Sequence, residues 1–429
     1  MLERVFRLSE NGSTIKVEVL AGLTTFLTMA YIIFVNPAIL ADAGMDRGAV
    51  FVATCLAAAF GSLAMGLLAN YPIALAPGMG LNAFFTYTVV GQMGHSWQVA
   101  LGAVFISGLL FLILSVLPVR EWIVNAIPRS LKIGISAGIG MFLGIIALKN
   151  AGVIAAHPAT LVTVGDLSQP ATLLAALGFA AMIALDRMRV SGGILIVILA
   201  ITALGLALGQ STFVGIVSLP PSLAPTLMQM DIAGALQIGV VTVVFAFLFV
   251  DLFDTAGTLV GVAHRARMLD AQGRLPRLRK ALLADSCATM AGAAFGTSTT
   301  TSYIESAAGI NAGGRTGLTA VVVALLFLLA LFFAPLAATI PAYATAPALL
   351  FVACLMIRGM SEIDWEDVTE AAPAALTALA MPLTFSIATG IGIGFVTYVA
   401  AKAMCGRFRE MGLAPPIIAA AFAIKFAML

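Results

Sequence analysis

The sequence predicts an all-α polytopic membrane protein that forms one membrane domain over residues 1–429. Hydrophobic residues make up 61% of the chain and charged residues 10%, and the mean hydropathy is +1.08, far above that of a soluble globular domain. Apolar stretches long enough to cross a bilayer recur along the whole chain. No polar stretch exceeds about 25 residues, which is too short for an independent soluble core.

Fourteen apolar stretches, bounded by charges or by Gly and Pro clusters, are the predicted spans. In chain order they cover residues 17–40, 48–69, 72–91, 97–117, 130–149, 171–186, 190–208, 235–258, 279–294, 296–312, 316–339, 342–358, 371–386 and 389–404. The net charge is only +2 and the basic residues are dispersed among loops. The sequence therefore offers no surface for a nucleic acid.

The distribution of Lys and Arg predicts the orientation of the chain. If the N-terminus is cytoplasmic, 19 of the 22 basic residues fall in cytoplasmic segments, and the exceptions are Arg47, Lys149 and Lys425. This asymmetry indicates an even number of crossings with both termini cytoplasmic. The charged stretch before the first span lacks the short apolar region of a cleavable signal peptide, and we expect an integral protein of a bacterial inner membrane. Residues 405–429 are expected to form a cytoplasmic or interfacial tail.

Fourteen spans divide into seven plus seven, and an odd number in each half predicts an inverted repeat. The third span of each half is interrupted. Span three, "NYPIALAPGMGLNAFFTY", contains two Pro and two Gly that cannot all lie in a continuous helix. Span ten opens with "GTSTTTSY", which favours an extended segment before a helix that begins between Ser302 and Glu305. Paired interruptions of this kind mark the substrate site of a transporter.

Three acidic residues are predicted to lie in the membrane, where a carboxylate costs about 2.5 to 3.5 kcal/mol. Glu305 lies in span ten, and Asp251 and Asp254 lie in "FAFLFVDLFDTAGTL" of span eight, where Thr255 shares a helix face with Asp251. We expect no cationic partner for Asp251 or Glu305, so desolvation favours their protonated forms, as proton coupling requires. The alternative is a structural role, such as capping a broken helix. For Asp254, near the cytoplasmic end of its span, a structural or gating role and a substrate contact both remain open.

Four motifs resemble those of the AzgA-like purine permeases, the adenine, guanine and hypoxanthine branch of the nucleobase-cation symporter (nucleobase-ascorbate transporter) superfamily. The motifs are "APGMGLNAFF" at 76–85, "FVDLFDTAGTLVG" at 249–261, "GTSTTTSYIESAAGI" at 296–310 and "PLTFSIATGIGIGFVTY" at 382–398. The resemblance covers essentially the whole chain. It implies a core domain (17–117 and 235–339) and a gate domain (130–208 and 342–404), with spans three and ten each beginning as a short strand that continues as a half-helix.

The resemblance also implies a function and a site. Asp251 matches an acidic substrate-binding position, Glu305 matches the acid of span ten, and Gly80 and Asn82 match functional positions of "GMGLN". Thr255 stands where the uracil branch has a histidine. The candidate substrate-binding residues are Asp251, Glu305, Asn82, Gly80, Thr255, Phe84 and Ser302, with Asp254, Thr301 and Asn36 as accessory positions. Asp251 and Glu305 are the candidates for proton coupling.

The implied activity is import of a purine nucleobase by proton symport, through elevator or rocking alternating access. The expected partners are the purine, protons, the lipid bilayer and a second copy of the chain through the gate domain, with no cofactor and no metal. An anion exchanger or channel on the same fold is the alternative, but two acids at the site disfavour anions. An intramembrane enzyme is not expected, because the chain lacks HExxH, suitable paired aspartates and a credible Ser/His pair.

Overall fold

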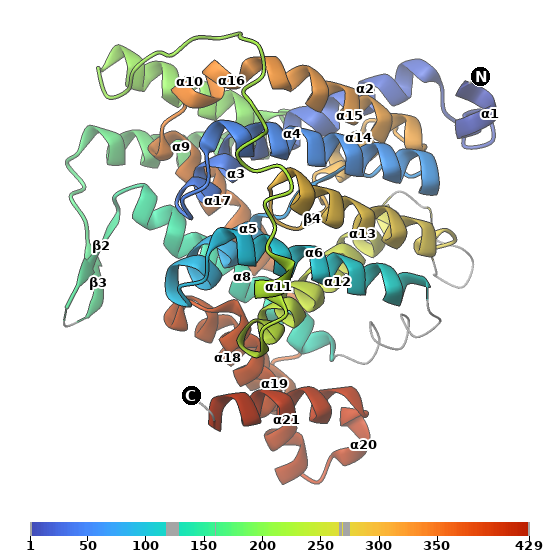
Figure 1. The fold of residues 1–429 in the computed structure, drawn as a ribbon, viewed down its shortest axis with the longest axis vertical. Helices are drawn as coiled ribbons and strands as arrows, with labels where there is room; N and C mark the ends of the chain where they lie inside the picture. Colours follow the sequence, from blue (N-terminus) through green and yellow to red (C-terminus); the bar gives the residue numbers. More distant parts are fainter. Residues whose placement is uncertain (1, 117–127, 159, 266–267, 269–274, 428–429) are drawn as a thin grey trace.

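The computed structural model describes residues 2–116, 128–158, 160–265, 268 and 275–427. It is a bundle of helices with four short strands, and the chain begins and ends in short helices (Figure 1). The first part comprises α1 (Leu2–Phe6), α2 (Ile15–Met29), α3 (Ile32–Ala41), α4 (Arg47–Ala64), a π-helical turn (Met65–Ala69), β1 (Leu75–Pro77), α5 (Met79–Ala83), a π-helical segment (Phe84–Gln92), α6 (Trp97–Val116), α8 (Arg129–Asn150), β2 (Ile154–His157), β3 (Leu161–Val164), α9 (Pro170–Arg187) and α10 (Gly193–Ala207).

The second part begins after a long connection. It comprises α11 (Ile232–Ala235), α12 (Ile238–Arg265), α13 (Leu278–Phe295), β4 (Thr300–Ser302), α14 (Ser306–Asn311), α15 (Gly317–Ala330), a 3₁₀ turn (Leu331–Phe333), α16 (Ala334–Thr339), α17 (Ala342–Ile357), a 3₁₀ segment (Arg358–Glu362), α18 (Val368–Thr384), α19 (Ile387–Met404), α20 (Phe408–Met411) and α21 (Ala414–Ala427).

Helices of membrane-spanning character are present along the whole chain. Among the described residues, eight are long and apolar enough to cross a bilayer, which confirms an integral membrane protein. Each of the fourteen predicted spans contains helix. Several of the observed helices, such as α10 and α14, are shorter than a straight crossing of the bilayer needs. The count of fourteen crossings therefore stays a prediction.

The predicted fold, all-α apart from short strands in spans three and ten, is incomplete, because α8 and α9 are joined by a β-hairpin. Strands β2 and β3 pair antiparallel, with Ile154 opposite Val164 and His157 opposite Leu161. The stretch "VIAAHPATLVTV" is rich in β-branched residues around a proline turn, a composition that favours paired strands. The first predicted span is also divided, since α2 ends at Met29 and α3 begins at Ile32.

The end of α2 nearest the N-terminus is anchored by a buried acid that the sequence prediction did not include. Glu18 is fully buried. Its carboxylate accepts hydrogen bonds from the backbone N–H groups of Arg315 (2.9 Å) and Thr319 (3.3 Å) and from the hydroxyl of Thr319 (2.5 Å). Because these groups lie at the start of α15, Glu18 satisfies donors that a helix N-terminus leaves without partners.

At the opposite face of the molecule, residues 208–231 form a long connection that we call the strap. It crosses from α10 to α11 (Figure 1). Along its length it is hydrogen-bonded to helix ends: Ser218 N–H to the Phe332 carbonyl (2.9 Å), and Met228 N–H to the Ala294 carbonyl (2.7 Å). Gly296, at φ +98°, leaves no room for a Cβ beside Thr226 of the strap. The strap is therefore fastened to α13 and α15–α16.

The tail after α19 is held by a cluster of ion pairs. The buried Lys402 lies 2.8 Å from both Glu370 and Glu410, and Arg407 pairs with Asp367 at 2.7 Å. Hydrogen bonds from the Thr369 hydroxyl and from Arg407 hold the pKa of Asp367 well below its usual range. Helix α21 then packs against α19. The expected tail is thus helical and fastened to the preceding helices.

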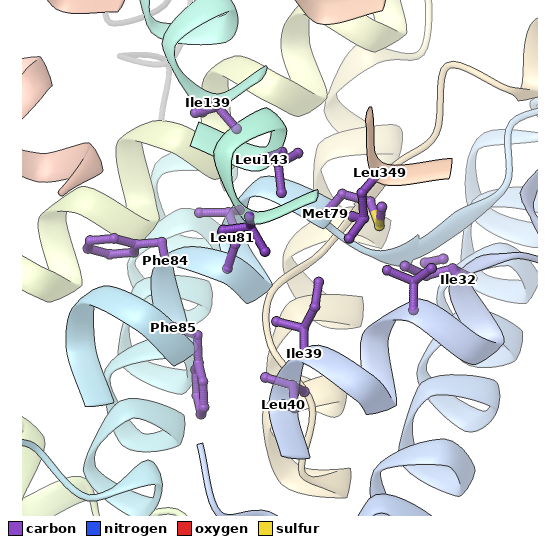
Figure 2. Close-up of a cluster of buried hydrophobic side chains, with 14 of the residues drawn as sticks. Ile32, Ile39, Leu40, Met79, Leu81, Phe84, Phe85, Ile139, Leu143 and Leu349 are labelled. Carbon is purple, nitrogen blue, oxygen red and sulfur yellow. The ribbon is translucent and has the colours of Figure 1, made fainter. Parts of the chain in front are cut away.

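A continuous apolar cluster joins helices that are distant in sequence. Figure 2 shows Met79 and Leu81 of α5 near Ile139 and Leu143 of α8, with Leu349 of α17 beside them. The contact is close, because a Cβ added to Gly80 would stand 2.3 Å from Cγ2 of Ile139. The interrupted third span therefore packs directly against α8.

Candidate functional site

Two interrupted segments meet in a buried two-stranded ribbon. Strand β1 pairs antiparallel with β4, with Leu75 opposite Ser302 and Pro77 opposite Thr300. Helix α5 follows β1 after Gly78, and α14 follows β4 and begins at Ser306. The extended segments predicted in spans three and ten are thus present and in contact. Irregular backbone at such depth is tolerated only inside protein or beside a cavity.

Several backbone groups of the ribbon and of Gly78 after it are hydrogen-bonded to neighbouring groups. Leu75 N–H donates to the Ser62 hydroxyl at 2.9 Å, and the Tyr303 hydroxyl donates to the Pro77 carbonyl at 2.5 Å. Gly78 N–H donates to the Thr299 carbonyl at 2.8 Å. Because these bonds replace the helix bonds that Pro and Gly remove, the broken backbone is stable in an apolar surrounding.

A buried amide network joins α3 and α5 to the segment before β4. The Asn36 side-chain amide donates to the hydroxyls of Thr54 and Thr297, each at 2.8 Å, and the Asn82 amide donates to the Asn36 oxygen at 2.9 Å. The other amide oxygen, Oδ1 of Asn82, is buried and accepts no hydrogen bond within the described part of the chain. Asn36 and Asn82 thus lie together, as the prediction of a shared site requires.

Asp251 is linked to the ribbon through one hydroxyl. Its side chain is 1% exposed. Thr289 Oγ1 of α13 lies 3.1 Å from Asp251 Oδ2 and 3.0 Å from the Thr300 carbonyl of β4. Helix α12, which carries Asp251, also contacts β4 and α14. The predicted acid of span eight therefore lies beside the predicted interruption of span ten.

Asp285 of α13 is a further buried acid that the sequence prediction missed. It is fully buried, and its Oδ1 accepts hydrogen bonds from the hydroxyls of Thr255 (2.9 Å) and Ser302 (3.2 Å). Both donors are predicted site residues. The signal was present in the sequence, because Asp285 lies in the interior of the predicted span 279–294.

Glu305 is held by a residue from the break in the first span. The Tyr31 hydroxyl donates to Glu305 Oε1 at 2.6 Å. Tyr31 lies between α2 and α3, where the Thr28 hydroxyl bonds back to the Thr25 carbonyl at 2.7 Å, a bond that commonly bends helices. Glu305 is only partly buried, in contrast to Asp251. Tyr31 had no place in the sequence prediction, since its role depends on this tertiary contact.

The remaining predicted residues differ in what they contact. Gly80 faces Ile139 of α8. The Phe84 ring is fully buried and meets Phe247 edge to face, with centroids 5.0 Å apart, so packing accounts for its position. Thr301 is buried in β4. The side chain of Asp254 lies outside the residues whose side chains the structure describes.

Taken together, the site offers carboxylates, hydroxyls and an amide oxygen around a broken backbone. Such groups accept and donate hydrogen bonds to a polar, uncharged ligand and can exchange protons. Within the described residues, no three His, Cys, Asp or Glu side chains gather in a group that could hold a metal ion.

Known proteins resemble the chain in sequence over nearly its whole length. Residues 16–393 match the model of the Permease family named Xan_ur_permease. The chain is 55% identical to the putative permease MJ0326 of Methanocaldococcus jannaschii, covering 100% of this chain and 98% of that protein. It is 50% identical to the adenine permease AdeP of Escherichia coli (99% and 96% covered), and 46% identical to the guanine/hypoxanthine permease PbuO of Bacillus subtilis (95% and 96% covered).

Solved structures show the same fold at low sequence identity. The transmembrane domain of the cyanobacterial bicarbonate transporter BicA superposes with a TM-score of 0.67 at 17% identity, covering 87% of this chain and 96% of that domain. SLC26A9 superposes with a TM-score of 0.65 at 10% identity, covering 93% and 68%. The resemblance read from the four motifs is confirmed at the level of the family: the chain is an integral membrane protein that belongs to the Xan_ur_permease family of permeases.

Proposed function

We propose that this permease imports a purine nucleobase together with protons. The observation that carries the proposal is the meeting of Asp251 with the β1–β4 ribbon through Thr289. Relatives 46–50% identical over nearly the whole chain are named as adenine and guanine/hypoxanthine permeases, which supports a purine as the substrate. At this level of identity a shared substrate class is the simplest expectation.

The groups at the site suit the edges of a purine. A carboxylate accepts N–H groups, and amides and hydroxyls match ring nitrogens and exocyclic atoms. In the proposed site Asp251 and Glu305 contact the base or its proton. Asn82 offers a buried amide oxygen, while Thr255 and Ser302 act through Asp285. Gly80 and Phe84 shape the packing around these groups.

The geometry at Thr289 supports proton coupling. A hydroxyl has one hydrogen, yet Thr289 Oγ1 lies within hydrogen-bond distance of two acceptors, Asp251 Oδ2 and the Thr300 carbonyl. If Asp251 is protonated, its O–H donates to Thr289, which then donates to the Thr300 carbonyl, and both contacts are satisfied. If Asp251 is ionised, one contact is lost. Protonation of Asp251 thus stabilises the arrangement of β4.

We further propose alternating access by movement of a core domain against a gate domain, in a fold of fourteen spans and two inverted repeats. The packing supports this division: α8, α17, α18 and α19 pack on one another, while α2, α4, α6, α13 and α15 form a second group. The proposed site lies on the second group and faces α8 through Gly80. In this proposal the protein lies in a bacterial inner membrane with both termini in the cytoplasm. Two copies form a homodimer through their gate domains.

Anion exchange or a channel is the second candidate, because BicA is a bicarbonate transporter and the fold is shared. Likeness at 17% identity shows the fold alone. In the proposed site an anion would meet the carboxylates of Asp251, Asp285 and Glu305, which is electrostatically unfavourable.

Uptake into proteoliposomes with an imposed pH gradient tests the proposal. We expect radiolabelled adenine or hypoxanthine to accumulate when the lumen is alkaline, and Glu305→Gln and Asp251→Asn to abolish accumulation. An excess of unlabelled adenine, guanine or hypoxanthine should compete, whereas uracil should not. Accumulation that is unaffected by the gradient and by protonophores would rule out proton coupling, and transport of bicarbonate without purine would favour the second candidate.

A further inference from the structure

A cavity of about 260 Å³ lies away from the β1–β4 ribbon, between the strap and the helix ends it covers. Its walls come from α3, α4, α16 and the strap, and include Phe34, Phe51, Pro335, Pro221 and Ser218. The volume exceeds what a single water or a bare ion fills. Among the described residues, none that belongs to the proposed transport site lines this cavity. Its lining comes near that site only at Pro37 on α3, which follows Asn36 in the sequence.

Arg47 is the charged residue among those that line this cavity. Its Nη2 donates to the carbonyls of Ala337 and Ile340 at 3.4 and 3.3 Å, so the guanidinium is oriented by the end of α16. A guanidinium has five N–H donors in a planar fork that matches a phosphate. These two long bonds leave most of that fork for a ligand. The neighbouring carboxylate, Asp46, is engaged as the N-cap of α4, accepting from Ala49 N–H at 2.7 Å.

Exposed apolar side chains flank the cavity-lining residues Ser218 and Ala334 in the sequence. On the strap, Val217 is 62% exposed and Leu219 is 82% exposed; on the facing helix end, Leu329 is 56% and Phe332 is 41% exposed. The backbone bond from Ser218 to Phe332 holds the two sides together. An exposed apolar patch of this kind requires a covering partner, and in a membrane protein the acyl chains of lipid are at hand.

We propose that this cavity binds an anionic phospholipid from the leaflet on the face opposite the N-terminus. The phosphate is held by Arg47 through charge-assisted hydrogen bonds, and the glycerol backbone enters the cavity between Phe51 and Pro335. The acyl chains cover Leu219 and Phe332. A bound lipid joins the strap to α4 and α16, so its effect is to stabilise that end of the helix bundle.

Thermal unfolding of the purified full-length protein in a neutral detergent tests the proposal, because it needs no transport. Phosphatidylglycerol, phosphatidylcholine, inorganic phosphate and adenine are titrated against the parent protein, Arg47→Gln, Arg47→Lys and Lys149→Gln. Lys149 is the matched control, a basic residue at the end of α8 that lies outside the cavity. For the parent and for Lys149→Gln we expect phosphatidylglycerol to raise the midpoint by several degrees more than phosphatidylcholine does, and inorganic phosphate to have no such effect.

In Arg47→Gln the half-saturating concentration of phosphatidylglycerol should rise at least tenfold, and Arg47→Lys should recover part of the affinity. The readout is the difference between lipids, so a lower midpoint of the lipid-free variant does not affect it. Equal protection of the parent and Arg47→Gln would overturn the proposal. An equal shift with inorganic phosphate would assign the site to a free anion, and Arg47-dependent protection by a purine would assign it to a nucleobase; either result refutes the lipid. Failure of proton-driven uptake would leave this result unchanged.

Discussion

At the scale of single residues, replacing Thr289 tests whether its hydroxyl takes part in transport or only packs between α12 and β4. Thr289→Val removes the hydroxyl between Asp251 and the Thr300 carbonyl while keeping the shape of the side chain. A buried acceptor left without its donor costs about 1–3 kcal/mol. We therefore expect a rise in KM for purine uptake of about 5- to 150-fold, measured in membranes with matched amounts of protein.

Thr289→Ser is the control, because it keeps the hydroxyl and should stay within about threefold of the parent. The pH at which uptake is half-maximal should also move in Thr289→Val, since the protonated Asp251 loses its acceptor. An unchanged KM and pH profile in Thr289→Val would show that Thr289 serves packing alone.

The site residues that the sequence predicts are those with a strong local signal, and their joint role in one substrate site stays a prediction. Asp251 and Glu305 are acids in apolar surroundings, and Asn82 follows a Pro and Gly interruption. Asp285 carried the same local signal, an acid inside a predicted span, and only its partners Thr255 and Ser302, on α12 and β4, depend on the fold. Tyr31 was missed because its role depends on its tertiary contact with Glu305. Periodicity identifies a span, but it does not show which span faces which.

At the scale of elements, the close contact between α5 and α8 permits a test of the interface between the proposed domains. In Gly80→Ala the new Cβ would stand 2.3 Å from Cγ2 of Ile139, so the Ile139 side chain must shift or α5 and α8 must separate. Overpacking of this kind costs about 1–3 kcal/mol. We expect the rate of purine uptake to fall at least tenfold, measured as initial uptake at saturating substrate.

The matched control is Gly144→Ala on α8, the helix that carries Ile139, where the nearest atom to an added Cβ is 3.7 Å away; it should transport normally. The double variant Gly80→Ala/Ile139→Ala removes the opposing methyl group and should recover most of the rate. If the double variant transports no better than Gly80→Ala, the effect does not arise from this contact.

Elements with distinctive sequence patterns were predicted, and those that depend on pairing were not. Two Pro and two Gly in span three and a run of hydroxyl residues in span ten predicted the extended segments, which form β1 and β4. The β2–β3 hairpin was missed because its short strands lie in a loop between two long apolar stretches. Hydropathy averaged over the length of a membrane span does not resolve strands of this length. The break at Tyr31 has no Gly or Pro beside it, and so gave no signal.

At the scale of the whole molecule, the basic residues predicted which helix ends share a face. The strap contacts the ends of α13 and α16, while Glu18 and Asn70 contact the start of α15 on the face of the N-terminus. These two groups of helix ends lie at opposite ends of α15, and the side of the membrane that each faces stays a prediction from the charge asymmetry. Sequence alone could not show that the strap follows one helix group throughout, because this depends on hydrogen bonds to backbone atoms rather than on residue type.

Because the strap is fastened to helices of the proposed core domain, it should move with that domain while the gate domain moves against both. Two cysteine pairs separate these motions in a chain from which the four free cysteines, Cys55, Cys287, Cys354 and Cys405, have been replaced. The pair Thr88→Cys/Phe385→Cys joins core to gate, where the Thr88 hydroxyl now donates to the Phe385 carbonyl at 3.0 Å. The pair Ser218→Cys/Phe332→Cys joins strap to core, at the backbone bond of 2.9 Å.

Cross-linking the core–gate pair should reduce purine uptake at least tenfold while purine binding persists, and a reductant should restore uptake, since alternating access needs relative movement of the domains. Cross-linking the strap–core pair should leave both uptake and binding within about twofold of the reduced protein, because no relative movement is expected there. Uptake is measured in proteoliposomes and binding by equilibrium dialysis. Normal uptake by the locked core–gate pair would refute domain movement, and loss of uptake in the locked strap–core pair would show that the strap itself must move.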